Sequence, residues 1–196
     1  MTGMLSEDGL DLIFRFARSY NGYLDKPVSE DQLRAIWDLM KMGPTSANMS
    51  PARVIWCVSQ EAKDKLAALS SGTNGAKIMK APVSAIIGYD VDFHEHFGRL
   101  FPHNPEVKDW FPDQAVRDHV AYRNGSLQGA YFLIAARAIG LDTGPMSGFD
   151  NAAVDEAFFA GTTIKSNFIS TLGYGDASTI FERLPRFDFE EANTIV

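Results

Sequence analysis

The longest helical pattern in the sequence, residues 113–139, constrains the fold more than any other feature. It covers about 27 residues, and its second half is apolar on nearly every side. A helix that lacks a polar face has to be buried all round. In a chain of this size we expect part of that burial to come from a partner subunit.

Two glycines, Gly125 and Gly129, lie four positions apart inside this predicted helix. Each costs the helix up to about 1 kcal/mol relative to alanine. A close approach of another segment to the helix backbone would offset that cost. A local kink is the alternative interpretation, and the pattern alone leaves both open.

Shorter patterns predict the remaining elements. A helix is expected over residues 6–18, with Ser6 as its cap, and a second helix begins at Ser29, where Gln32 completes a capping box, and ends at Gly43. Strands are predicted over residues 53–58, 83–89 and 167–172, further helices over residues 59–69, 74–80 and 150–159, and a short acidic helix in the tail. Residues 140–150 predict a glycine-rich turn, and residues 91–112 an irregular segment. Helices separate the few strands, so the class is α+β or α/β.

Composition narrows the function classes. The chain has 196 residues, which favours a single domain, and its net charge of -7 with a pI near 5.0 makes nucleic acid and anionic membranes poor partners. Its single cysteine, Cys57, cannot form an intrachain disulfide. No basic-then-apolar leader opens the sequence, and the most apolar stretch, residues 131–139, contains Arg137. We therefore expect a soluble cytoplasmic protein.

The sequence carries no complete motif for dinucleotide binding, metal binding or serine hydrolysis. Residues 173–178 resemble a dinucleotide fingerprint, but they lack its third glycine and leave no room for the fold it requires. His94 and His96 have no partner cluster that would predict a metal site, so no metal is expected. Ser147 does not lie in a nucleophile elbow, which leaves a hydrolase as a weak alternative.

The positive signals are candidate anion-binding residues. They are Arg18 with Ser19, Asn74 with Lys77, and Arg183 with Arg186. The planar guanidinium group suits phosphate, although any one pair can equally be a surface charge. Two loops, residues 44–51 and 140–148, are rich in small residues and proline, and such loops let the backbone approach a flat ligand closely.

In order and spacing, these segments resemble the FMN-dependent nitroreductase family. The resemblance covers nearly the whole chain and rests on four stretches: Arg18-Ser19 with Lys26-Pro27-Val28; Pro44-Thr45-Ser46-Ala47-Asn48-Met49-Ser50-Pro51; Gly140-Leu141-Asp142 with Pro145-Met146-Ser147-Gly148-Phe149-Asp150; and Gly173-Tyr174 with Leu184-Pro185-Arg186. The stretches at residues 43–48, 144–150 and 174–178 look more narrowly like the malonic semialdehyde reductase branch, which acts in pyrimidine degradation.

The resemblance implies an α+β, nitroreductase-like fold. Its features would be a small mixed β-sheet flanked by helices, an intertwined homodimer with one FMN in each subunit interface, a C-terminal segment that reaches the other subunit, and the long helix with Gly125 and Gly129 as the dimer core. It also implies the cofactor-binding residues. The phosphate would be held by Arg18 and Arg186, with Ser19 and Asn21 near the phosphate, the ribityl chain or the ring edge. The flavin would be contacted by Ser46, Asn48, Asn74, Lys77, Pro145, Met146, Ser147 and Gly148.

The implied activity is ping-pong hydride transfer, in which NADH or NADPH reduces the flavin and an oxidant then takes its place. No catalytic side chain is assigned, because the flavin carries the hydride. Malonic semialdehyde would be reduced to 3-hydroxypropionate. The alternatives are a nitroaromatic or quinone reductase and a flavin-binding module without turnover. Three departures from the family pattern, Asn21, Ser147 and Leu184, bear on flavin affinity and nicotinamide preference, and Arg183 could compensate for Leu184.

Overall fold

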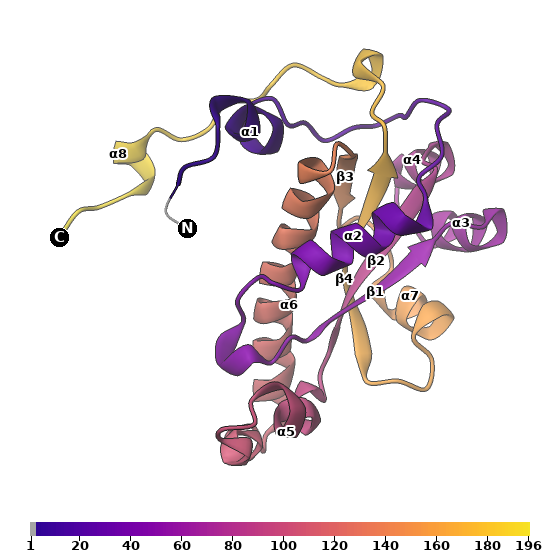
Figure 1. The fold of residues 1–196 in the computed structure, drawn as a ribbon. Helices are drawn as coiled ribbons and strands as arrows, with labels where there is room; N and C mark the ends of the chain where they lie inside the picture. The colour runs from indigo at the N-terminus through magenta and orange to yellow at the C-terminus, as the bar shows by residue number, and fades with distance from the viewer. Residues whose placement is uncertain (1–2) are drawn as a thin grey trace.

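A computed structural model describes residues 3–196 and contains one four-stranded sheet (Figure 1). The strand order is β1-β2-β4-β3. The strands are β1 (Ala52–Cys57), β2 (Val83–Asp90), β3 (Asp142–Met146) and β4 (Ile164–Gly173). The three predicted strands are confirmed as β1, β2 and β4, with ends shifted by one to three residues.

The sheet differs from the expected mixed sheet, because every neighbouring pair of strands is antiparallel. Along the chain, β1 and β2 are connected by two helices, α3 (Gln60–Ala68) and α4 (Asn74–Lys80), which pack on each other. A pair of helices carries the chain out and back, whereas a single crossover helix would have returned it for a parallel strand. Parallel pairing within residues 3–196 is limited to the isolated bridge between Ser19 and Thr143.

Strand β3 corrects the prediction of a turn over residues 140–150. It contains Gly144 and Pro145, two residues that are depleted in strands and concealed the pattern. Proline is tolerated at a sheet edge, and β3 is an edge strand whose neighbouring strand is β4.

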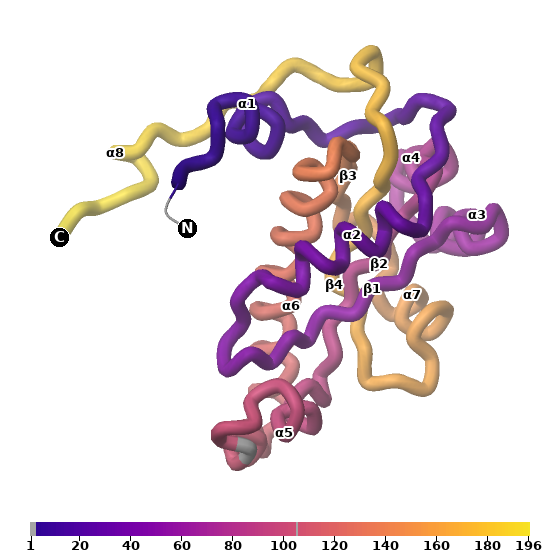
Figure 2. The backbone as a smooth tube through the Cα atoms, viewed as in Figure 1, coloured from indigo at the N-terminus to yellow at the C-terminus, as the bar shows by residue number. Residues whose placement is uncertain are grey.

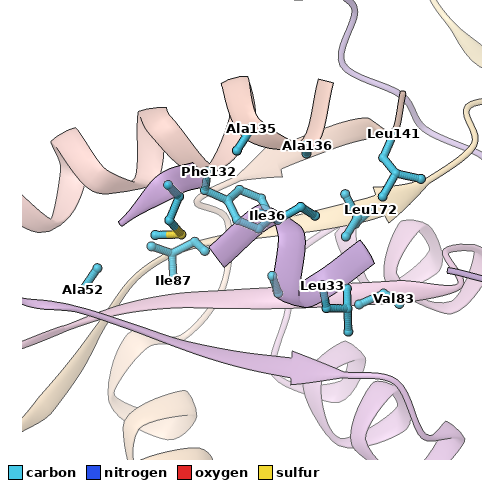
Figure 3. Packing of buried hydrophobic residues seen from close by; sticks show 12 residues of the cluster. Leu33, Ile36, Ala52, Val83, Ile87, Phe132, Ala135, Ala136, Leu141 and Leu172 are labelled. Carbon is cyan, nitrogen blue, oxygen red and sulfur yellow. The ribbon is translucent and has the colours of Figure 1, made fainter. Parts of the chain in front are cut away.

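One face of the sheet is covered by α2 (Glu30–Met40) and the long helix α6 (Gln114–Ala138). The capping box of Ser29 and Gln32 is confirmed at the start of α2, and Asp113 caps α6. Figure 3 shows the core between these layers. Its fully buried members include Ile36 and Met40 from α2, Ile87 from β2, Phe132 from α6, and Leu172 from β4.

The two glycines of α6 mark a close approach and no break, since the helix is continuous through them. A Cβ atom at Gly129 would lie 2.4 Å from the Phe168 ring, and one at Gly125 would lie 2.8 Å from Cβ of Tyr89. The glycine side of α6 therefore packs on the sheet of its own chain and is not available as a dimer core. The reason is steric: only a side without Cβ atoms admits these two aromatic residues.

The other face is covered by α3, α4 and α7 (Asn151–Phe158). Its core includes Cys57, Leu66, Ile78, Ile86 and Val154, all fully buried. Asp150 caps α7 as predicted, since its carboxylate accepts a hydrogen bond from the Ala153 N–H at 3.0 Å.

Residues 91–112 are irregular with short helices, as predicted: η3 (Phe93–His96), α5 (Phe97–Leu100) and η4 (Pro105–Trp110). They enclose a third core of Met49, Phe93, Phe97, Val107 and Ala121. Within this segment Phe93 is fully buried, whereas the neighbouring Glu95 and His96 are exposed. Asp90 anchors this segment to the sheet through Arg53 at 2.8 Å and Thr163 at 2.6 Å.

The two ends of the chain cross each other (Figure 2). The predicted helix over residues 6–18 is shorter, with α1 (Glu7–Leu10) running into the π-helical turn η1 (Asp11–Arg15). After η5 (Ala177–Thr179), the C-terminal segment passes α1 and leaves the body of the chain, carrying α8 (Phe189–Ala192) at its far end. None of the helices in residues 3–196 is both long and apolar enough to cross a lipid bilayer.

Candidate functional site

An arginine-lined cleft of about 650 Å³ lies where the chain ends cross. We call it the arginine cleft. It contains three of the predicted residues, Arg18, Ser19 and Arg186, together with Arg137 and Arg183. Arg18 and Ser19 follow η1, Arg137 lies near the end of α6, and the other two arginines lie on the C-terminal segment.

The guanidinium groups of this cleft are bonded to backbone carbonyls and not to acids. Arg18 donates to the Phe181 carbonyl, and Arg183 donates to the carbonyls of Arg15 and Ala17 at 2.7 and 3.0 Å. None of the four arginines has an ion pair within residues 3–196. Glu182 is the one acidic residue that lines the cleft. In a chain with net charge -7, this is a local concentration of positive charge suited to an anion.

Asn21 lies next to the cleft and ties the C-terminal segment in place. Its side-chain amide donates to the Thr179 carbonyl at 3.0 Å. The neighbouring Tyr20 N–H donates to the Thr143 carbonyl at 3.1 Å, next to the bridge between Ser19 and Thr143. These contacts fix residues 19–21 against the edge strand β3.

Strand β3 connects the cleft to the second group of predicted residues. From Thr143, the strand runs about 10 Å to Met146, because each residue advances a strand by about 3.3 Å. The loop that follows is joined to α4, since Asn74 Nδ2 donates to the Gly148 carbonyl at 2.9 Å. A Cβ atom at Gly148 would lie 2.7 Å from that amide nitrogen, so glycine permits the contact.

This second group contains the other predicted ring contacts. Pro145 and Ser147 are exposed, and Met146 is half-buried against the core of α3, α4 and α7. Lys77 lies one turn after Asn74 on α4, half-buried, and forms no ion pair with any residue from 3 to 196. Strand β3 and the loop after it thus connect the arginine cleft to Asn74 on α4.

Ser46 and Asn48 belong to a separate loop with a strained backbone. Ala47, Asn48 and Ser50 have φ values of 47°, 52° and 41°, a region that L-residues seldom occupy. The loop is held by Asn124, which accepts from the Ser46 N–H at 2.9 Å, and by a bond from the Asn48 side chain to the Leu100 carbonyl at 2.8 Å. Strain retained in this way is typical of functional loops.

The structure does not bring this loop to the other predicted residues within one chain. Asn124 and Arg137 are thirteen residues apart on α6, which corresponds to about 20 Å along the helix axis. The loop with Ser46 and Asn48 lies at the first of these residues and the arginine cleft at the second. One chain therefore keeps Ser46 and Asn48 apart from the predicted residues of the arginine cleft.

Comparison with known proteins decides the family. The sequence matches the Nitroreductase family over residues 15–174. A protein from Caulobacter sp. (strain K31), described as a candidate NADH dehydrogenase/NAD(P)H nitroreductase, is 56% identical over 192 residues, which are 98% of each chain. The chain belongs to the nitroreductase family. Its resemblance to that family, inferred from four motifs, is confirmed.

Solved structures agree with the nitroreductase fold. A candidate nitroreductase from Bacillus subtilis superposes with a TM-score of 0.87 at 18% identity, covering 97% of this chain and 100% of that one. A candidate nitroreductase from Exiguobacterium sibiricum, in complex with FMN, superposes with a TM-score of 0.85 at 18% identity and covers 100% of both chains. The α+β, nitroreductase-like class is confirmed.

Within this nitroreductase chain, the residue that sequence reasoning missed is Arg137. It entered that reasoning only as a charge that interrupts an apolar stretch. Burial lowers the pKa of its guanidinium group from the ordinary value; Asp142 opposes the shift and Arg183 adds to it. A charged residue in an otherwise apolar, buried helix end was the signal that could have identified it. No group of three His, Cys, Asp or Glu side chains in residues 3–196 is placed to hold a metal ion.

Proposed function

We propose that residues 1–196 form a single domain that binds FMN and works as an NAD(P)H-dependent oxidoreductase. The observation that carries the proposal is the arginine cleft, whose four guanidinium groups lack acidic partners within residues 3–196. A phosphate monoester carries up to two negative charges, and a planar guanidinium group can donate two hydrogen bonds to a pair of its oxygens. The buried Arg137 Nε atom, which has no hydrogen-bond partner within residues 3–196, also fits an anion that is still to be bound.

The chain's own residues bind and orient the cofactor. Arg18, Ser19 and Arg186 hold the phosphate, and Asn21 positions the segment around it. The loop of Pro145, Met146, Ser147 and Gly148 lies along the flavin, with Asn74 and Lys77 at its pyrimidine edge. When bound, FMN supplies hydride transfer from a nicotinamide to the oxidant. The Lys77 ammonium stabilises negative charge at that edge, because a fixed cation in a partly buried site is weakly screened.

A homodimer completes the site. The loop with Ser46 and Asn48 is too far along α6 to contact a flavin that is bound beside β3 of the same chain. A second copy can supply it, and Leu127 and Tyr131, two exposed apolar side chains four positions apart on α6, offer a surface for that copy. The C-terminal segment, with Phe181, Leu184 and Phe187 exposed, supplies a second surface that needs cover.

The substrate we propose is malonic semialdehyde, which is reduced to 3-hydroxypropionate. This finer proposal rests on the stretches at residues 43–48, 144–150 and 174–178, which resemble that branch of the family. A nitroaromatic or quinone substrate is the second candidate, favoured by the description of the Caulobacter relative. Hydride delivered to an aldehyde carbon requires a proton at its oxygen, and bound water or a loop hydroxyl can provide it.

Anaerobic reduction of the purified protein tests the proposal. We expect a flavin absorption spectrum that bleaches on addition of NADH or NADPH and returns when the oxidant is added. The kcat/KM for malonic semialdehyde is then compared with that for nitrobenzoate and for a benzoquinone. An aldehyde rate at background with a nitroaromatic rate orders of magnitude higher would select the second candidate. A flavin that neither nicotinamide reduces would indicate a binding module without turnover, and a colourless protein that takes up no FMN would refute the proposed function.

A further inference from the structure

Arg137 lies in the arginine cleft with unused hydrogen-bonding capacity. Its one hydrogen bond within residues 3–196 is a long contact, 3.3 Å, from Nη1 to the Ile13 carbonyl. Its Nε atom is buried and has no partner there. Buried donors in folded proteins nearly always have an acceptor, so the Arg137 guanidinium group is a site where an acceptor is missing.

The charge around Arg137 says what kind of acceptor would fit. Asp142 is the acidic residue whose charge acts on the Arg137 guanidinium group. The two side chains do not form an ion pair, and the Asp142 carboxylate accepts a hydrogen bond from the Gly175 N–H at 2.8 Å instead. Arg183 is close enough to act on Arg137 as a second positive charge. Two like charges in a half-buried place are unfavourable unless an anion lies between them. The missing acceptor is therefore an anionic oxygen.

Arg137 also differs from the other cleft arginines in how it is held. It lies near the end of the 25-residue helix α6, directly after Ala135 and Ala136, which belong to the buried core between α6 and the sheet. Arg18, Arg183 and Arg186 lie on segments without regular structure at the crossing of the chain ends. A rigid cation fixes the position of a ligand before the less constrained cations close around it, which reduces the entropy lost on binding.

We propose that Arg137 is a binding residue for the FMN phosphate, placed at the inner wall of the arginine cleft. The inference rests on the proposed function, and it assigns to α6 the fixed part of the phosphate site. Arg18, Arg183 and Arg186 then form its outer, closable part. The contact requires the phosphate group, so it distinguishes FMN from riboflavin, which has the same ring and ribityl chain without the phosphate.

The test is a comparison of FMN and riboflavin binding by the full-length protein after its flavin has been removed. Quenching of flavin fluorescence gives Kd for both ligands in the parent protein, in Arg137→Gln and in the matched surface control Arg34→Gln. Arg34 lies on α2, exposed, and is paired with Glu30 outside the cleft. Loss of one charge-assisted hydrogen bond should raise the Kd for FMN by roughly 10- to 100-fold in Arg137→Gln. The Kd for riboflavin should change by less than about two-fold, and Arg34→Gln should match the parent for both.

Other results would overturn the inference. Equal weakening of both ligands would mean that Arg137 acts through its contact with Ile13 as a structural residue. An unchanged Kd for FMN would remove it from the site. If Arg137→Gln does not fold, as judged by circular dichroism, Arg137→Lys is measured instead; it keeps the charge and loses Nε, and an FMN-selective loss of smaller size is expected. If the parent protein binds neither flavin, the proposed function is refuted as well. If the parent binds FMN, and the ratio of the Kd for FMN to the Kd for riboflavin is the same in Arg137→Gln as in the parent, this inference alone is refuted.

Discussion

Single polar residues on α6 explain how a strained loop is held against the sheet. Gln128 is buried, and its Oε1 atom accepts from the Ala52 N–H at 2.8 Å, while Asn124 accepts from the Ser46 N–H at 2.9 Å. Both side chains lie on the side of α6 that contacts β1 and the loop before it. They accept hydrogen bonds from the backbone N–H groups of Ser46, in that loop, and of Ala52, the first residue of β1, and apolar side chains could not do so.

Replacing Gln128 tests this role. In Gln128→Leu, the buried Ala52 N–H loses its acceptor, and the free energy of unfolding should fall by about 1–3 kcal/mol. Urea unfolding followed by circular dichroism measures the change. Gln60→Leu, at an exposed position of α3, is the control and should stay within about 0.5 kcal/mol of the parent. No loss in Gln128→Leu would show that water satisfies the Ala52 amide equally well.

Cys57 makes the free energy of unfolding depend on pH in the alkaline range. Its thiol is fully buried between β1 and the helices on that face, and burial raises its pKa from the ordinary value of 9.0 to about 11. Between these two values, the unfolded chain loses the thiol proton while the folded chain retains it. The free energy of unfolding therefore decreases as the pH rises from 9 to 11, by up to about 1.4 kcal/mol per pH unit.

Cys57→Ala isolates that contribution from those of the tyrosines. The pKa of Tyr23 and of Tyr89 is also raised, chiefly by burial, so the parent destabilises with rising pH for several reasons. Urea midpoints at pH 8, 9, 10 and 11 should fall less steeply in the variant than in the parent. Parallel curves over this range would contradict the assignment. Cys57 is the single cysteine of the sequence, so no other thiol contributes to the difference between the two curves.

At the scale of the elements, the glycines of α6 set the distance between the helix and the sheet. The Phe168 ring occupies the space in which a side chain at Gly129 would stand. This packing joins α6 to β4, and so indirectly to β3 and the candidate site. The glycine side of α6 thus supports the sheet of its own chain, and only the opposite side of the helix is left for a partner subunit.

Gly129→Ala should be destabilising although alanine favours helix. The added methyl group would lie 2.4 Å from a Phe168 ring atom, and overpacking of this kind typically costs about 1–3 kcal/mol, more than the gain in helix propensity of up to about 1 kcal/mol. Thermal unfolding measures the loss. Gly98→Ala in α5 is the matched control, since nothing lies within 4 Å of the added atom there, and its Tm should not decrease. An equal or higher Tm in Gly129→Ala would mean that Phe168 moves aside freely.

At the scale of the whole molecule, two of the surfaces that one chain leaves exposed carry large apolar residues that a second copy could cover. One follows the outer side of α6, where 48% of Leu127 is exposed; the other is the C-terminal segment, where 79% of Phe181 and 81% of Phe187 are exposed. A single chain gains nothing by exposing so many large side chains. The homodimer proposed above would bury them and would bring the loop of Ser46 and Asn48 to the flavin site of the other subunit.

Leu127→Asp tests the dimer and its link to the cofactor. A carboxylate in a buried apolar interface is unfavourable, so the variant should sediment as a monomer at micromolar concentration and retain much less FMN than the parent. Leu127→Met, which conserves volume, should remain dimeric and yellow. Analytical ultracentrifugation at 280 and 450 nm reports mass and flavin together. A dimeric Leu127→Asp with full flavin content would exclude this side of α6 from the interface.

The sequence by itself determined the elements whose signals are local. The long helix, the capping box at Ser29, the cap at Asp150 and three of the strands depend on periodicity and on hydrogen bonds between residues a few positions apart, so one chain segment carries all the information needed. The anion-binding pairs were also visible, because arginine and lysine are recognised by their type.

The tertiary structure decided everything that depends on distant segments. Strand β3 contains Gly144 and Pro145 and exists because β4 pairs with it at an edge. The glycines of α6 were ambiguous until Phe168 and Tyr89 were seen to pack on them. Arg137 became a candidate for the site only when the crossing of the chain ends placed it in one cleft with Arg18 and Arg183. In each case the deciding contact joins residues far apart in the sequence, and no local pattern records which segments the fold will place together.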